Sequence, residues 1–167
     1  MFGEYDFKKD IVKGVYLEDI VKEMIFERCQ DVKCVYTNKD DKYDLKILFN
    51  DNTYCTIEVK YDMMSAKTGN IAIETMCRGK YSGINKSIAD YYIYGIFIEN
   101  KLRIFILRRI NLINELKKNC FKRVIGGDLY NGKPSTEMII LPIDYFIKIS
   151  IEITNKNKFV FGIRKNK

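Results

Sequence analysis

The sequence predicts a single α/β domain with a mixed central sheet flanked by helices. Three observations support this class: an amphipathic pattern near the N-terminus, a series of short apolar or alternating runs separated by turn residues, and another helical pattern in the second half. A chain of 167 residues, 47% of them hydrophobic, is long enough for one domain with its own core. We therefore treat residues 1–167 as one domain, without internal repeats or linkers.

The first predicted element is a helix over about residues 10–29. Glu18 lies at the border of its apolar stripe, neither in the core nor in open solvent. Gly14, one turn earlier, allows this helix to approach another backbone or a phosphate closely. The stripe consists of apolar residues at three- and four-residue steps: Leu17, Ile20, Val21, Met24 and Ile25.

Three strands are predicted between residues 32 and 60. A polar turn between two short apolar runs is typical of a hairpin, so we expect the last two strands to pair with each other. The strands span residues 32–37, 44–49 and 54–60, and the turn is Asn50-Asp51-Asn52.

The strand over residues 54–60 carries an acid and an amine on one face. Because side chains alternate along a strand, Glu58 and Lys60 point away from the apolar face that runs from Cys55 to Val59. Asp44 begins the neighbouring strand and is expected to reach the same spot. Two carboxylates and a lysine can hold a hard divalent cation beside a positioned amine. The alternative is an ordinary hairpin with a solvated charged face.

The rest of the chain is predicted to continue the mixed pattern. Residues 143–153 fit a helix or a strand equally well, and their type is left open. The other expected elements are a loop over 61–70, a strand over 71–74, a helix over 84–89, a hairpin of strands 91–98 and 102–107 turning at Asn100, a helix over 111–119, a basic glycine-containing loop over 121–134, and an edge strand over 138–141 that ends at Pro142.

Composition excludes several kinds of chemistry. The chain has no histidine, which rules out Ser-His-Asp triads and other histidine-dependent acid–base catalysis. A net charge of +7 fits a polyanionic partner. Five cysteines without a Cys-x-x-Cys pair indicate reduced, buried thiols in the cytoplasm. We expect no membrane partner, because no apolar run has transmembrane length and residues 1–6 do not resemble a secretory signal.

Asp44 followed by Glu58-Val59-Lys60 resembles the motif of the PD-(D/E)xK nuclease superfamily, in which the aspartate opens one strand and Glu-x-Lys lies in the next. Tyr43 stands where the family name has proline. The resemblance implies a restriction-endonuclease-like fold, with a mixed central sheet flanked by helices. It also implies magnesium-dependent hydrolysis of DNA phosphodiester bonds that leaves a 5′ phosphate. Mn²⁺ is expected to replace Mg²⁺, and no small-molecule cofactor is expected.

Two further stretches extend this resemblance to roughly half of the chain. Lys13-Gly14-x-x-x-Glu18 resembles the first helix of the archaeal Holliday-junction resolvase branch, where the glutamate faces the metal site; the alternative is a surface glutamate. Small phage-type nucleases of the superfamily have a Thr-Gly-Asn strand ending in Glu, then Ser-Gly-Ile, then an Ala-Asp-aromatic step. This chain has Thr68-Gly69-Asn70 leading to Glu74, then Ser82-Gly83-Ile84 and Ala89-Asp90-Tyr91.

The resemblance implies a role for each motif residue. Asp44, Glu58 and the carbonyl of Val59 would hold the metal ion. Lys60 would orient and help activate the attacking water and offset charge on the phosphorane. Glu18 would complete the metal shell directly or through water.

Other side chains are candidates for the active site or for contacts with DNA. Glu74 is a second candidate for the active site, and the alternative is that it forms an ion pair with Lys80 or Arg78. Tyr81 and the tyrosines at 91, 92 and 94 are suited to base stacking, although core packing is favoured for them. The expected nucleic-acid-binding residues are Lys13, Lys67, Thr68, Lys80, Lys122, Arg123 and Lys133.

The resolvase resemblance implies branched DNA as substrate and a homodimer as the active form. The hairpin over 91–107 or the strand over 138–141 is expected to supply the dimer contact. Two alternatives stay open. The first is another nuclease with the same site, either a restriction-type or defence endonuclease or an exonuclease. The second is a catalytically inactive nucleic-acid-binding module. The sequence does not separate them, because geometry and partners decide the substrate.

Overall fold

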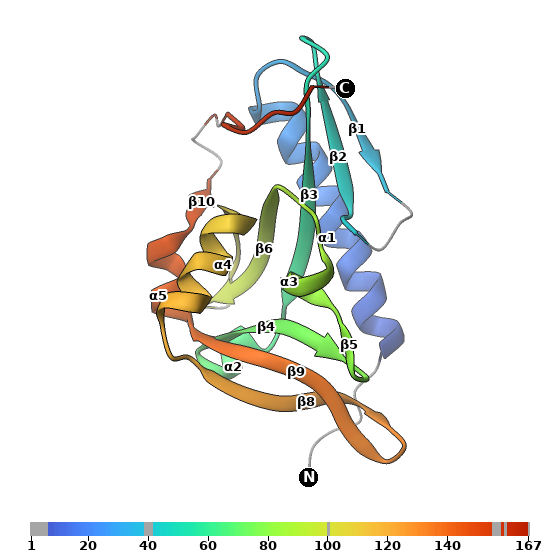
Figure 1. Ribbon diagram of the computed structural model, residues 1–167. Helices are drawn as coiled ribbons and strands as arrows, with labels where there is room; N and C mark the ends of the chain where they lie inside the picture. Colours follow the sequence, from blue (N-terminus) through green and yellow to red (C-terminus); the bar gives the residue numbers. More distant parts are fainter. Residues whose placement is uncertain (1–6, 39–41, 100, 155–157, 159, 167) are drawn as a thin grey trace.

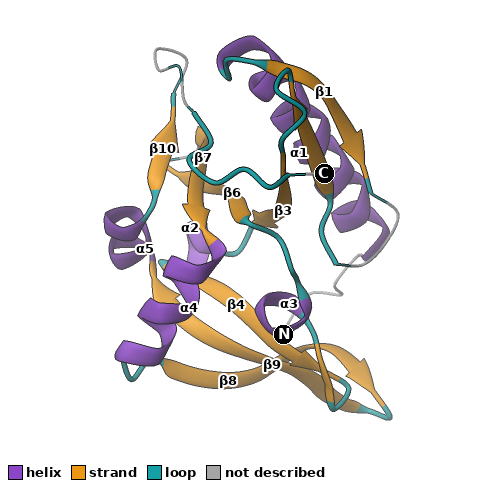
Figure 2. Ribbon diagram, turned by 45° about the horizontal axis from the view of Figure 1, so that its top comes forward, coloured by secondary structure: helices purple, strands orange, loops and turns teal. Residues whose placement is uncertain are grey.

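The computed structural model describes residues 7–38, 42–99, 101–154, 158 and 160–166, without the side chains of residues 7–15 and 128. The described residues form a mixed α/β structure with two sheets (Figures 1 and 2). One is a six-stranded, mostly antiparallel mixed sheet in the order β1-β2-β3-β6-β7-β10, and the other a four-stranded sheet in the order β5-β4-β9-β8. The expected mixed sheet flanked by helices is present, whereas the second sheet was not predicted.

The six-stranded sheet contains both strands of the motif. Only β3 and β6 pair in parallel; the other neighbours are antiparallel. Because parallel strands need a crossover connection, the chain leaves this sheet after β3 and returns at β6. The strands are β1 (Val32–Thr37), β2 (Leu45–Phe49), β3 (Tyr54–Asp62), β6 (Tyr91–Ile98), β7 (Lys101–Arg108) and β10 (Ile151–Ile153).

Helix α1 (Phe7–Arg28) covers one face of this sheet, as Figure 1 shows. Its apolar stripe is buried, and Leu17, Val21 and Ile25 are at most 1% exposed. The predicted helix is confirmed, and so is the stripe, although its members Ile20 and Met24 are only partly buried. The C-terminal segment also contributes to this core, through Phe161.

The second sheet and four short helices cover the opposite face. Together they form a second core in which Tyr92 and Phe105 of the six-stranded sheet meet Ile73, Leu141 and Phe146. Strand β6 at the centre of this sheet is therefore buried on both faces along most of its length. The elements of this layer are α2 (Ser65–Thr68), β4 (Asn70–Cys77), β5 (Lys80–Tyr81), α3 (Gly83–Lys86), α4 (Arg109–Lys118), β8 (Lys122–Tyr130), β9 (Lys133–Pro142) and α5 (Ile143–Ile149).

The predicted loop over 121–134 is wrong, because these residues form the β8–β9 hairpin. The glycines that suggested a loop lie at an irregularity in the strand pairing, between Gly126 and Leu129. Gly127 has a φ of +73°, a conformation that glycine adopts without strain. A bulge inside a strand therefore accounts for the loop-like composition of this stretch.

Other predicted boundaries also change. The stretch 138–141 is part of β9, which lies between β4 and β8 and is not an edge strand. The open stretch 143–153 contains helix α5 and then strand β10. Helix α2 interrupts the loop expected over 61–70, and α3 is shorter than the helix expected over 84–89.

Both stretches expected to supply a dimer contact have their strand edges paired within the chain. In the hairpin over 91–107, β6 lies between β3 and β7, and β7 is covered by β10. The strand over 138–141 has a neighbour on both sides. Pairing with a second copy through the edges of these strands is therefore not available, and the dimer itself stays a prediction.

The remaining expectations concern cysteines and membranes. All five cysteines are free; Cys29 and Cys55 are buried, Cys34 and Cys77 are partly buried, and Cys120 is exposed. The expectation of buried thiols therefore holds for two of the five. No described helix combines the length and the apolar character needed to cross a bilayer. The predictions for residues 1–6 and for the turn at Asn100 lie outside the described residues.

Candidate active site

Asp44 lies at the point where the β2–β3 pairing ends. Its N–H donates to the carbonyl of Ile57 at 2.9 Å, and its Oδ2 accepts the N–H of Val59 at 2.7 Å. The register ends at Leu45 opposite Ile57, so no residue of β2 pairs with Val59. In an antiparallel pair the N–H and C=O of one residue point to the same side. The carbonyl of Val59 therefore faces the same strand end as the Asp44 carboxylate.

Glu58 and Lys60 form an ion pair on the face of β3 opposite to α1. The Nζ of Lys60 lies 2.6 Å from Oε1 of Glu58. Glu58 is only 7% exposed, whereas the Lys60 side chain is 40% exposed and reaches the surface. The predicted alternation along β3 is confirmed. The alternative of a solvated charged face is wrong for Glu58, because the second layer covers it.

A buried serine that the sequence analysis did not select holds the other oxygen of Glu58. Ser87 follows α3 and donates its hydroxyl to Oε2 of Glu58 at 3.1 Å. Tyr92 pairs with Glu58 in the β3–β6 register and is 1% exposed. Its hydroxyl has no hydrogen-bond partner among the described residues. Ser87 lies between the two stretches 82–84 and 89–91 of the phage-type resemblance and Tyr92 follows the second, but no local pattern reveals that they meet Glu58.

The electrostatics of the site reflect burial and close charges. Burial raises the pKa of the Glu58 carboxyl, the Lys60 ammonium opposes that effect, and Asp44 adds to it. Burial alone would lower the pKa of Lys60, but Glu58 and then Asp44 outweigh it and raise this pKa above its ordinary value. Lys60 is therefore held as a cation beside the carboxylates.

Helix α1 brings Glu18 to the same charged region. Burial raises the pKa of the half-buried Glu18 carboxyl, and the charge of Asp44 is the next largest cause. Lys60 is also among the charges that act on it. Glu18 thus lies within electrostatic reach of Asp44 and Lys60, and it is partly buried at the border of the apolar stripe as expected.

The carboxylate oxygens of Asp44 and Glu58 and the carbonyl oxygen of Val59 are of the type that binds hard cations. The Oδ2 of Asp44 accepts a backbone N–H, and no described donor is bonded to Oδ1. Carboxylate and carbonyl oxygens are the ligands that Mg²⁺ and Ca²⁺ prefer. However, no three acidic or thiol side chains among the described residues gather into a group that could hold a metal ion. The donor set that fits is therefore two carboxylates, Asp44 and Glu58, with the carbonyl of Val59.

Six of the seven predicted DNA-contacting residues lie in the second layer, and the seventh lies in α1. Lys122 and Arg123 are exposed on β8, and Lys133 is exposed on β9, so all three belong to the β8–β9 hairpin. Lys80 is exposed on β5. Lys67 and Thr68 are exposed on α2, and Lys13 lies in α1 where its side chain is outside the described residues.

The secondary candidates divide between core and surface. Tyr91, Tyr92 and Tyr94 are buried, which confirms that they pack in the core, whereas Tyr81 is 70% exposed. Glu74 lies inside β4, where it pairs with Met138 in the register. In the described part of the chain Glu74 forms no ion pair with Lys80 or Arg78. The guanidinium of Arg78 lies over the Tyr130 ring instead, 5.1 Å from its centroid.

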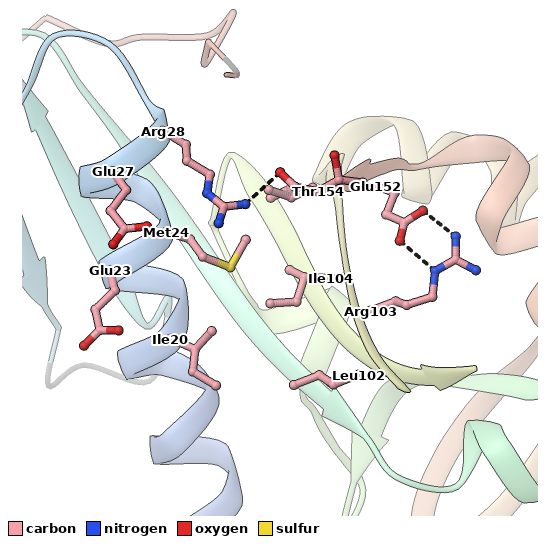
Figure 3. A pocket seen from close by; sticks show the side chains of 11 residues that line it. Ile20, Glu23, Met24, Glu27, Arg28, Leu102, Arg103, Ile104, Glu152 and Thr154 are labelled. Carbon is pink, nitrogen blue, oxygen red and sulfur yellow. Dashed lines mark hydrogen bonds and ion pairs between the residues drawn. The ribbon is translucent and has the colours of Figure 1, made fainter. Parts of the chain in front are cut away.

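A separate cavity of about 460 Å³ lies between α1 and the edge of the six-stranded sheet at β7 and β10 (Figure 3). It contains none of the predicted site residues. Its walls include Glu23 and Glu27 of α1, and Arg103 donates two hydrogen bonds to Glu152 at one side. The chemistry of the motif is therefore not located in this cavity.

No family model matches the chain, and searches of curated proteins and of solved structures find no match either. The function must therefore be argued from the residues themselves.

Proposed function

We propose that the protein is a magnesium-dependent DNA nuclease of the PD-(D/E)xK type, with a restriction-endonuclease-like domain. The observation that supports this proposal best is the convergence at one strand end. Asp44 contacts the backbone of β3 at Val59, and Glu58 and Lys60 pair on the same strand. These residue types and this order along the chain match the motif.

Each residue has a definite part in the proposed reaction. Asp44, Glu58 and the Val59 carbonyl would hold the cation. When bound, the cation neutralises phosphate charge and lowers the pKa of a water nucleophile. Lys60 stays protonated, orients the attacking water and offsets the negative charge that develops on the phosphorus centre. Glu18 stands outside the donor set, so we assign it the water-mediated role.

Purified protein incubated with Mg²⁺ tests the proposal directly. Duplex, single-stranded, flap and four-way-junction DNA should each be offered, and products should be examined for a 5′ phosphate. Cleavage of at least one substrate that chelation abolishes is the expected result. DNA binding without cleavage in both Mg²⁺ and Mn²⁺ would instead support the inactive binding module.

Glu18→Gln should lower cleavage by about tenfold or more, as loss of an outer metal contact commonly does, while raising stability at neutral pH. The sign follows from the raised pKa of Glu18. A carboxyl whose pKa is higher in the folded state than in the unfolded state destabilises the fold when the pH exceeds the pKa of the unfolded state. The destabilisation is complete when the pH also exceeds the pKa of the folded state. Glutamine removes that penalty. Thermal unfolding at pH 4 and pH 7 should show the gain at pH 7 alone; a variant that loses both activity and stability would indicate a structural role.

DNA binding should depend strongly on salt and should persist without the metal. The net charge of +7 and the exposed Lys122, Arg123 and Lys133 are the reasons. Each lost phosphate contact should reduce the slope of log K against log salt by about 0.9 on duplex DNA. Lys122→Ala, Arg123→Ala and Lys133→Ala can be compared with the wild type by fluorescence anisotropy at several salt concentrations. A flat response in the wild type would contradict the electrostatic contact.

A further inference from the structure

Oε2 of Glu58 is held in a fixed position. Ser87, 2% exposed, donates its hydroxyl to this oxygen at 3.1 Å, while its own Oγ accepts the N–H of Ala89 at 3.2 Å. A hydroxyl has one proton and two lone pairs. Because Ala89 occupies a lone pair, the proton of Ser87 is directed to Glu58. Oε1 is then the oxygen that is able to change partner.

The backbone around Ser87 is tied down on three sides. The N–H of Ser87 donates to Gly83 in α3, and that of Ile88 donates to the carbonyl of Lys42, two residues before Asp44, both at 3.0 Å. The N–H of Asp90 donates to the carbonyl of Thr56 on β3, also at 3.0 Å. The Ser87 hydroxyl is thus a rigid support, positioned relative to both strands of the motif.

The Tyr92 hydroxyl is a buried polar group without a hydrogen-bond partner among the described residues. Its ring is stacked on Tyr94, with centroids 6.0 Å apart and an interplanar angle of 22°. Burial raises the pKa of Tyr92 to about 12; a side-chain interaction with the Ser87 hydroxyl opposes this rise most, the charge of Glu58 adds to it, and the charge of Lys60 opposes it. A buried hydroxyl left unpaired destabilises a fold, so its retention calls for an explanation.

We propose that Ser87 and Tyr92 are positioning residues that allow Glu58 to exchange Lys60 for a divalent cation. The inference rests on the proposed nuclease function. Ser87 holds Oε2 in place while Oε1 turns from the Lys60 ammonium to the cation. The released ammonium then donates to the Tyr92 hydroxyl oxygen, to which no described donor is bonded. Neither residue needs to touch the DNA.

Binding of Mn²⁺ to the DNA-free protein tests the proposal without relying on activity. The electron paramagnetic resonance signal of free Mn²⁺ gives the Kd. Ser87→Ala should raise this Kd by about tenfold, and Tyr92→Phe by about threefold to tenfold, as expected for groups that orient a metal ligand.

Two controls each remove one hydroxyl hydrogen bond elsewhere. Ser150→Ala loses the bond from Oγ to the carbonyl of Phe146, and Tyr91→Phe loses the bond that its hydroxyl accepts from the N–H of Ile163, both 2.7 Å long. Tyr91 is the direct neighbour of Tyr92 but faces the α1 core. Both controls should bind Mn²⁺ as the wild type does.

Two further readouts separate positioning from a structural role. Ser87→Ala should need more Mg²⁺ for half-maximal cleavage yet approach the wild-type kcat at saturating Mg²⁺. In the metal-free protein, Tyr92→Phe should not lower the midpoint of thermal unfolding, whereas Tyr91→Phe should. A lower midpoint for Tyr92→Phe would overturn its assignment, because the hydroxyl would then have a partner already.

The possible failures are distinguishable. If the wild type binds Mn²⁺ and cleaves DNA but Ser87→Ala and Tyr92→Phe behave like their controls, the positioning roles are wrong and the nuclease function stands. If the wild type neither binds Mn²⁺ nor cleaves DNA, both the function and the positioning roles are overturned.

Discussion

Asp44→Asn, Glu58→Gln and Lys60→Ala should each lower the cleavage rate by about 10²–10³-fold or more, the usual cost of losing one group that stabilises charge in a transition state. The fold should survive in all three variants. Asparagine at position 44 still offers an oxygen to the N–H of Val59, and glutamine at position 58 keeps the shape of a side chain that is 7% exposed. Single-turnover cleavage with saturating Mg²⁺, together with circular dichroism, measures both properties.

Metal binding should divide these variants into two groups. Asp44→Asn and Glu58→Gln remove a ligand charge and should weaken Mn²⁺ binding. Lys60→Ala should spare or tighten it, because the ammonium that now lies 2.6 Å from Oε1 of Glu58 is gone. Lys46→Ala on the neighbouring strand, whose ammonium lies over the Tyr54 ring, is a matched control for the loss of one positive charge. Wild-type cleavage by all three site variants would show that the site assignment is wrong.

Asp90→Ala should give the largest loss of stability, about 3 kcal/mol, the cost typical of removing one partner from a buried charged network. The Oδ2 of Asp90 accepts both the N–H and the hydroxyl of Thr56 at 3.0 Å, and the ammonium of Lys165 lies 2.7 Å from Oδ1. Thr56 is 3% exposed, so the substitution leaves its N–H buried without this acceptor. Urea denaturation followed by circular dichroism measures the loss.

Two companion variants define the cause. Asp90→Asn keeps an acceptor for Thr56 and should lose clearly less stability than Asp90→Ala. Lys165→Ala removes only the partly exposed partner and should cost at most about 1 kcal/mol, as for surface ion pairs. Equal losses for Asp90→Ala and Lys165→Ala would show that the ion pair matters more than the buried hydrogen bonds.

Local patterns in the sequence were sufficient for the elements that carry the motif. The alternation along 54–60 placed Glu58 and Lys60 on one face, and the ion pair confirms it. The three- and four-residue spacing along α1 predicted the buried stripe and the border position of Glu18. Both patterns depend only on the period of a strand or a helix, which neighbouring residues determine. The hairpin of β2 and β3 likewise followed from its short polar turn.

The second layer could not be predicted in the same way. The glycines of β8 are equally typical of a loop and of a bulged strand, and only the pairing with β9 distinguishes the two. The charge pattern of β3 also gave no sign that Glu58 is buried, because burial depends on what packs against that face. The predicted edge strand over 138–141 was wrong because its position in the sheet likewise depends on the strands that pair with it.

By itself, the sequence determined which residues of β3 share a face, and that Asp44, Glu58 and Lys60 follow the order and spacing of a nuclease motif. Only the tertiary structure decided what surrounds them. Ser87 lies 29 residues from Glu58 along the chain, and Lys165 lies far beyond Asp90, yet both contacts are direct. The first contact exists because β3 and β6 pair in parallel, which requires the intervening chain to cross over and return, and the second because the C-terminal segment pairs with Tyr54 at the start of β3. Partners brought together by such a crossover have no fixed spacing in sequence, so no local period can reveal them.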